Sequence, residues 1–226
     1  TDYISASRWN RANNRVQLFG EDGDDELHVI GDPGYSALLD GGAGNDRIYL
    51  DGFMYGDLTV ATGAGTDTVY LGRLDNPAPT IRFTDFTAGA GGDVLNWGAV
   101  LGFALIGWNG YNPFQLGFAR LVQEGGDVLL QLDRDGSGSA HQWYTLITFV
   151  SAVRTDFSAA NFGFNPLATP GQLYNGTATN DVFNGTGGDD VMQGDNGDDV
   201  LNGGAGNEDL MGGVGRDTLA GGEGND

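Results

Sequence analysis

The feature that most constrains this chain is a nine-residue repeat in which an acid stands at position six and an apolar residue at position eight. In the unit GGAGNDRIY, which starts at Gly41, these residues are Asp46 and Ile48. The C-terminal part repeats the unit without interruption, starting at Gly176, Gly185, Gly194, Gly203, Gly212 and Gly221. Self-similarity at a fixed period predicts a fold built from stacked repeats.

The same nonapeptide occurs more widely spaced in the N-terminal part. It reads GEDGDDELH from Gly20, GGAGNDRIY from Gly41 and TGAGTDTVY from Thr62, and a looser unit, AGAGGDVLN, starts at Ala88. The first three of these units recur every 21 residues. A flexible glycine-rich linker would not keep an acid at a fixed offset from an apolar residue, as every complete unit does. We therefore interpret both parts as folded repeats.

The first six residues of each unit have the composition of a turn, and the last three that of a short strand. Gly, Asn and Asp tolerate left-handed backbone conformations, and Gly contributes 41 of the 226 residues, more than twice its usual share. If two units form one coil, turns two units apart stack on the same edge and the strands lie parallel. The sequence therefore predicts an all-β fold, a parallel β-roll or β-solenoid.

We expect three parts along the chain. Residues 1–96 form the first roll block, 97–165 an antiparallel β segment, and 166–226 the second roll block. Strands are expected in the middle segment at 118–123, 127–132 and 142–150. The first block has one repeat turn per coil and the second has two. We therefore expect one row of metal sites in the first block and two rows in the second. The last unit is incomplete, which suggests a fragment of a longer protein.

The charge of the chain limits its partners. The net charge is −21, from 31 acids and 10 bases, and every base is Arg. Such a chain is not expected to bind nucleic acid or an anionic membrane surface, and cations are its natural partners. The chain has no Cys, which excludes disulfides and thiolate metal sites. It opens on no apolar run, and its longest apolar stretch, residues 99–108, is too short for a membrane span.

Stacking would place the carboxylates of successive turns above one another, where like charges repel. A divalent cation between adjacent turns would remove this repulsion. Ca²⁺ accepts six to eight oxygen ligands in flexible geometry, whereas Mg²⁺ is small and retains its waters. Zn²⁺ prefers His or Cys, and the chain has two His and no Cys. Open turns also direct backbone carbonyl oxygens inward, so several bound Ca²⁺ ions are expected.

The expected calcium ligands occupy positions one, three and six of the repeat. The sixth-position carboxylates are Asp25, Asp46, Asp67, Asp93, Asp181, Asp190, Asp199, Glu208, Asp217 and Asp226. Backbone carbonyl oxygens are expected from Gly41, Ala43, Gly203 and Ala205.

A different candidate site lies in the middle segment. Residues 133–138, DRDGSG, are similar to the opening of an EF-hand loop, but Tyr144 stands where that loop has its bidentate Glu. The segment also falls between expected strands rather than helices. A hairpin turn is therefore the favoured interpretation, and a Ca²⁺ ion at Asp133 and Asp135 is the alternative.

The repeat resembles that of a known family. Residues 41–49 match every fixed position of G-G-x-G-x-D-x-U-x, and residues 212–220 and 203–211 match it too, except that Glu208 replaces Asp. Over roughly residues 20–96 and 176–226 the chain is similar to the RTX, or haemolysin-type, calcium-binding repeat proteins. The resemblance implies a parallel β-roll with Ca²⁺ between its turns. It also implies a secreted bacterial protein exported through the type I secretion machinery.

Two departures from the pattern carry expectations of their own. Thr177, Ala178 and Thr179 replace glycine-rich turn positions, so the first unit of the second block is expected to act as a cap. Glu208 is one methylene longer than Asp and is expected to distort its site.

The sequence contains no expected catalytic centre. His28 and His141 are the only histidines, and neither an H-E-x-x-H helix nor a G-x-S-x-G elbow occurs. We expect no enzyme in this chain, and any catalytic domain of a parent protein would lie outside it.

An alternative function is that of an adhesin or surface-layer module, located outside the cell or on its surface. Trp108, Tyr111 and Phe114 lie among Gly, Asn and Pro, so they could stack on a glycan or contact another cell-surface protein. Aromatic residues of a β domain more often belong to its core, and that interpretation stays open.

Overall fold

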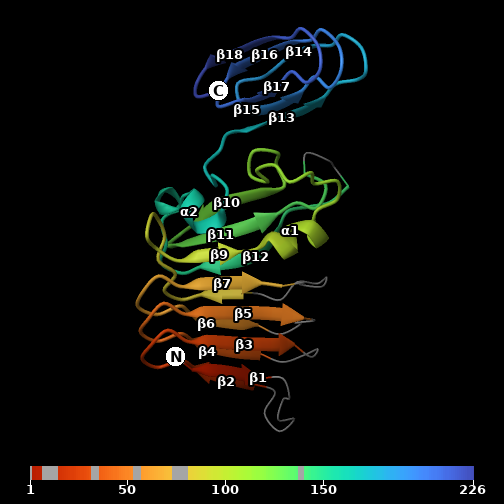
Figure 1. Cartoon of the computed structure of the whole chain (residues 1–226). Coiled ribbons are helices and arrows are strands. Elements are labelled where there is room, and N and C mark those ends of the chain that lie inside the picture. The colour runs from red at the N-terminus through yellow and green to blue at the C-terminus, as the bar shows by residue number, and fades with distance from the viewer. Residues whose placement is uncertain (1, 7–14, 32–35, 53–56, 73–80, 137–139) are drawn as a thin grey trace. The chain divides into compact units, whose positions relative to one another are not determined.

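The computed structural model describes residues 2–6, 15–31, 36–52, 57–72, 81–136 and 140–226. Strands dominate, with two short α-helices and one 3-10 turn (Figure 1). Two compact units are present, one of residues 1–108 and 120–166, the other of residues 109–119 and 167–226. The boundaries expected at residues 96 and 165 remain a sequence-based prediction. Among the described residues, no helix has the length and apolar character needed to span a membrane.

The first unit is a roll made of two sheets. One sheet has the order β1-β3-β5-β7-β9, at Tyr3–Ala6, Glu26–Gly31, Arg47–Gly52, Thr68–Leu71 and Val94–Asn96. The other has the order β10-β11-β12-β8-β6-β4-β2, at Ala119–Glu124, Asp127–Leu132, Tyr144–Phe149, Ile81–Phe83, Leu58–Ala61, Ser36–Asp40 and Arg15–Phe19. The nonapeptide turns connect strands of the second sheet to strands of the first, all on one edge. The predicted parallel β-roll is confirmed.

The apolar residue at position eight forms the core of this roll. Leu27, Ile48, Val69 and Leu95 stand in register across the parallel strands β3, β5, β7 and β9, and each is at most 1% exposed. Because strand side chains alternate between faces, a fixed offset from the turn places one apolar residue per coil inside.

The segment between the two repeat blocks extends the second sheet of the roll. Strand β12 pairs in parallel with β8, matching Ile147 with Ile81, and pairs antiparallel with β11. The strands expected at 127–132 and 142–150 therefore exist as β11 and β12, and that expected at 118–123 as β10. Phe149 stacks on Phe83 at 5.5 Å between ring centroids, so aromatic packing joins this segment to the roll.

Two helices of the first unit have no counterpart in the sequence-based prediction. Helix α1 spans Gly98–Ala104, and α2 spans Ala159–Phe162 after a 3-10 turn at Arg154–Asp156. Asn161 on α2 is fully buried and accepts a hydrogen bond from the backbone N–H of Gly89 at 2.9 Å. Its amide donates to the Asp93 carbonyl oxygen at 2.8 Å, so α2 ties itself to the last repeat turn of this unit.

The second unit has repeat turns on both edges, as the uninterrupted repeat predicts. Its sheets have the orders β13-β15-β17 and β14-β16-β18, at Pro170–Asn175, Asp189–Gln193 and Asp209–Met211, and at Val182–Asn184, Val200–Ala205 and Thr218–Glu223. The core is thin. Val191, Met192 and Leu201 are fully buried, but Leu219, in register with Leu201, is 45% exposed.

We expect the buried apolar position to carry much of the stability of the first unit. Ile48→Ala should lower the free energy of unfolding by about 2–5 kcal/mol, because it leaves a cavity in a closed core. Ile30→Ala is the matched control on the adjacent strand β3, where the side chain is 50% exposed, and should cost less than about 1 kcal/mol. Urea unfolding in saturating Ca²⁺ measures both. Similar losses for the two variants would contradict the assigned register.

Candidate metal centres

The repeat turns owe their shape to positions two and four of the nonapeptide. In the turn that begins at Gly41, Gly42 has φ +96° and Gly44 has φ +142°. The same two positions have positive φ in the turns beginning at Gly20, Thr62, Ala88, Gly194, Gly203, Gly212 and Gly221. Such angles strain most side chains, which explains why Gly dominates both positions.

The carboxylate at position six links each turn to its neighbour. The backbone N–H of Asp46 donates to Asp67 Oδ1 at 2.7 Å, and that of Asp25 donates to Asp46 Oδ1 at 2.8 Å. In the second unit the N–H of Asp199 donates to Asp217 Oδ1 at 3.0 Å, and that of Glu208 to Asp226 Oδ1 at 3.1 Å. One oxygen of these acids is thereby fixed in a ladder parallel to the roll axis.

The second carboxylate oxygen is buried without a hydrogen-bond partner in both units. This holds for Oδ2 of Asp46, Asp67 and Asp199 and for both oxygens of Glu208, in side chains between 0% and 5% exposed. A buried charge that lacks a partner is strongly destabilising. Burial accordingly raises the pKa of Asp46, and it raises those of Asp67 and Glu208 to about 7. Each site therefore requires a proton or a cation.

The first-position glycine lets neighbouring turns approach closely. A Cβ atom on Gly41 would collide with the carbonyl oxygen of Thr62 and would lie 2.6 Å from Asp46 Oδ2. A Cβ on Gly203 would lie 2.5 Å from the carbonyl oxygen of Gly221 and 2.8 Å from Glu208 Oε2. An oxygen of the acid and a carbonyl oxygen of the next turn thus lie together beside the same glycine.

The residues present fit a calcium ion. The converging donors are oxygens, which a hard cation prefers, and they combine side chain with backbone as Ca²⁺ sites do. No group of three or more His, Cys, Asp or Glu side chains converges within the described part of the chain, so a metal held by side chains alone is not indicated there. Each turn contributes a single acid at position six, and at Gly41, Gly194 and Gly203 a backbone carbonyl oxygen lies near that acid.

The other expected ligands occupy more varied surroundings. Asp25 is 1% exposed and accepts from the backbone N–H of Asp2. Asp217 and Asp226 belong to the ladder but lie at the more exposed end of the second unit. The carboxylates of Asp93, Asp181 and Asp190 accept hydrogen bonds from threonines.

The expected carbonyl ligands also differ among themselves. The Gly41 and Gly203 carbonyl oxygens lie against the first-position glycines of the preceding turns. The Ala43 carbonyl oxygen accepts from the N–H of Gly23 at 2.6 Å. Ala205 donates its N–H to the Thr186 carbonyl oxygen at 3.2 Å.

The EF-hand-like segment lies in the connection between the antiparallel strands β11 and β12. Asp135 accepts hydrogen bonds from the backbone N–H groups of Ala140 at 2.9 Å and His141 at 3.2 Å. Burial raises the pKa of Asp133. Residues 137–139 lie outside the described residues. Backbone donors thus engage the Asp135 carboxylate, and the choice between a hairpin turn and a Ca²⁺ site stays a prediction.

The aromatic candidates for glycan binding are divided between the two units. Trp108 belongs to the first unit and contacts Phe164 edge-on, with 6.3 Å between ring centroids. Phe114 is 2% exposed in the second unit, and Tyr111 accepts a hydrogen bond from Gln193 at 2.5 Å there. Phe114 thus has the core placement that the sequence left open.

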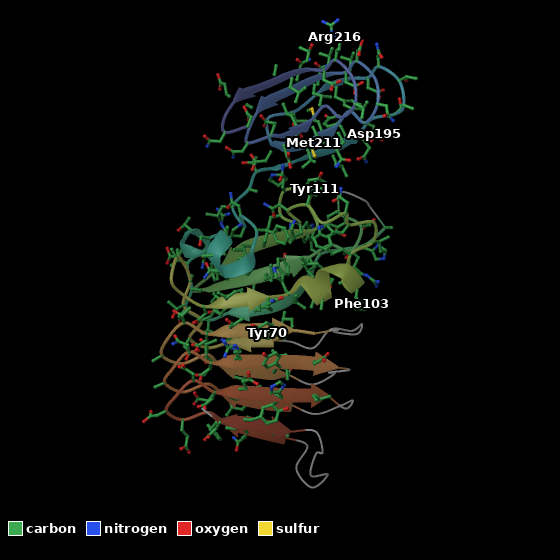
Figure 2. All side chains as sticks on the ribbon, viewed as in Figure 1. Tyr70, Phe103, Tyr111, Asp195, Met211 and Arg216 are labelled. Atoms are coloured by element: carbon green, nitrogen blue, oxygen red, sulfur yellow. The ribbon has the colours of Figure 1, made fainter. Side chains whose placement is uncertain are left out.

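The sequence interpretation missed an aromatic stack on the outer face of the first unit. His28 stacks on Tyr49 at 4.2 Å between ring centroids, and Tyr49 on Tyr70 at 4.6 Å. Figure 2 labels Tyr70 on this roll. All three residues occupy position nine of their units, which is the signal that would have revealed the stack. His28 is therefore part of a stack of aromatic side chains on the first unit.

These turns define a parallel β-roll whose stacked carboxylates are suited to a cation. A family model of the RTX calcium-binding nonapeptide repeat matches the chain in four copies, at residues 38–53, 175–207 and 203–226. A comparison with curated proteins finds no match. The chain thus contains RTX repeats, and its β-roll is a calcium-binding module of structural rather than catalytic character. Such repeats occur in secreted bacterial proteins.

The raised carboxyl pKa values predict how pH affects the metal-free protein. Unfolded Asp and Glu titrate near pH 4, whereas Asp67 and Glu208 in the fold titrate at about 7. Between these values the folded state holds more protons than the unfolded state, so the metal-free fold should lose stability as pH rises from about 4 to about 7. Thermal unfolding in metal-depleted buffers measures this slope, starting at about pH 4, where the metal-free fold is most stable, and the folded baseline should be lost as the pH approaches 7.

Asp67→Asn is the control variant for this prediction, because it keeps the shape of the side chain and removes the titrating group. The slope should become shallower in the first unit of that variant. A slope unchanged by Asp67→Asn, or stability that rises with pH in the wild type, would contradict the assignment.

Proposed function

We propose that this chain is a calcium-dependent folding module of a secreted bacterial protein, exported unfolded by a type I system and folded by extracellular Ca²⁺. One observation carries the proposal: buried carboxylate oxygens without partners recur at Asp46, Asp67, Asp199 and Glu208, in the turns of both units. Calcium would be held there by the acid of one turn and backbone carbonyl oxygens of neighbouring turns. The bound ion supplies the positive charge that these sites lack.

The charge of the second repeat block supports this proposal. Residues 176–226 contain 11 acids and one Arg, which gives −11 + 1 = −10. Two like charges about 4.8 Å apart repel by on the order of 3 kcal/mol at an effective dielectric constant of about 20. The thin core around Val191, Met192 and Leu201 offers little burial to offset such repulsion along two rows of turns.

Outside the cell, calcium binding would supply a stabilisation large enough to offset the repulsion between the stacked acids. With a Kd of about 0.1 mM and about 1 mM free Ca²⁺, each ion adds roughly 1.4 kcal/mol. Several ions together would reach the total stability of an ordinary domain, about 5–15 kcal/mol. At the far lower calcium concentration of the cytosol this term vanishes. The chain would therefore remain unfolded before export, as a secretion channel requires.

Chelation of calcium should unfold most of the chain. The far-UV circular dichroism of the wild type should change from a β spectrum in about 1 mM Ca²⁺ to that of a disordered chain in excess chelator, because the repulsion between turns is no longer compensated. Magnesium at equal concentration is the control and should not restore the β signal. A β signal that persists in chelator would contradict the proposal.

A phased carboxylate should matter more than an exposed one. Asp46→Ala should abolish at least one calcium site in calorimetric titration, because Asp46 is 1% exposed and its Oδ2 has no hydrogen-bond partner. Asp57→Ala is the matched control, since Asp57 is exposed and lies outside the repeat positions. That variant should bind as many ions as the wild type. Equal losses in the two variants would show that the repeat phase is wrongly assigned.

A further inference from the structure

Three of the ten phased acids already have hydroxyl donors from the protein. Asp93 is the clearest case. Its Oδ1 accepts from the N–H of Asp67 at 2.9 Å, and its Oδ2 accepts from the N–H of Thr87 at 2.8 Å and from the hydroxyl of Thr62 at 2.9 Å. Both oxygens of this fully buried carboxylate are therefore satisfied, unlike those of Asp67 one turn before it.

Thr62 stands at the first position of its unit, where Gly20, Gly41, Gly194 and Gly203 have no side chain. Its side chain is fully buried, and its hydroxyl reaches the carboxylate of the next turn, Asp93. Asp85 completes the closure, because its Oδ1 accepts from the backbone N–H of Thr62 at 2.8 Å and its Oδ2 from that of Gly63 at 3.2 Å. A cation beside Thr62 would find the Asp93 Oδ2 already bound.

In the second unit, two carboxylates accept hydrogen bonds from a threonine at position two of their own turn. Asp181 Oδ2 accepts from the N–H and the hydroxyl of Thr177, at 2.7 and 3.0 Å. Asp190 Oδ2 likewise accepts from the N–H and the hydroxyl of Thr186, at 2.6 and 3.1 Å. Each threonine thus binds the acid four residues later in its own turn.

The backbone explains why these two turns differ from the others. Position two has positive φ in the open turns, even where it is not Gly: Asp195 has φ +72° and Glu21 has φ +70°. Thr177 and Thr186 are not among the residues with positive φ. A β-branched residue strongly disfavours that conformation, so threonine at position two turns its N–H toward the carboxylate instead.

The closed carboxylates share a location at the ends of the rows. Asp93 belongs to the last repeat turn of the first unit, and Asp181 and Asp190 to the first turns of the two rows in the second unit. A carboxylate in the interior of a row has a turn on either side to provide carbonyl oxygens. One at the end has fewer such neighbours, so a hydroxyl donor there replaces a cation that would be incompletely coordinated.

We propose that Thr62, Thr177 and Thr186 are protein-supplied caps that close their carboxylates to calcium and confine the ions to the turns between them. This inference rests on the proposed function, since it specifies which turns take the ions. Threonine at position one or two thereby sets the number of calcium ions, and glycine at the same position admits one more.

Substitution of the caps tests the inference on the full chain. Thr62→Gly and Thr186→Gly should each raise the number of bound Ca²⁺ ions by one, measured by equilibrium dialysis with metal analysis. Thr62→Ser and Thr186→Ser keep the hydroxyl and should bind the wild-type number. The two caps lie in different units, so a folding defect in one variant leaves the other informative.

The outcomes separate this inference from the proposed function. A wild-type chain that binds no Ca²⁺ would overturn the proposed function itself. A wild type that binds Ca²⁺, with glycine variants that bind the same number, would overturn the caps alone. Fewer ions in the glycine variants would assign the threonine hydroxyls as calcium ligands and would equally overturn the inference.

Discussion

The structure depends on one buried interaction, that between the sixth-position carboxylate of one turn and the backbone of the next. One oxygen accepts an N–H group, as between Asp46 and Asp67, and so sets the register of the stack. The other has no partner at Asp46, Asp67 or Asp199, and at Asp46 and Asp199 it lies beside the first-position glycine. A second ladder runs in the opposite direction at position five, where Asn45 donates its N–H to Asp24 Oδ1 at 2.7 Å. The backbone is thus satisfied while the carboxylates are left in need of a cation.

In each unit the stability depends on how many repeat turns carry buried acids and on how large the apolar core is. The first unit has one row of repeat turns, and its second sheet continues into β12 and β11, which add buried aromatic residues such as Phe149. The second unit has turns on both edges around a much smaller core. On the proposed function, calcium would contribute a larger share of the stability in the second unit, where apolar burial is least.

Much of this could be predicted from the sequence because the repeat encodes local geometry directly. The period and the turn composition of the repeat predicted the parallel β-roll. The offset from Asp46 to Ile48 predicted the row of buried apolar residues at position eight. Helix α2 could not be predicted, because Asn161 acts through tertiary hydrogen bonds to Gly89 and Asp93. The hydrogen bonds of Thr62, Thr177 and Thr186 to the position-six carboxylates were also missed. The role of Thr62 depends on a contact with Asp93, 31 residues away.

The central claim is that the carboxylate oxygens without partners are calcium ligands. A crystal structure grown in Ca²⁺, with anomalous difference density recorded from calcium or a substituting lanthanide, tests it most directly. Peaks are expected within bonding distance of Asp46 Oδ2 and Asp199 Oδ2, and no peak is expected at Asp93 Oδ2, which accepts a hydrogen bond from Thr62. Density absent from the two expected positions, or carboxylates turned outward to solvent, would contradict the account.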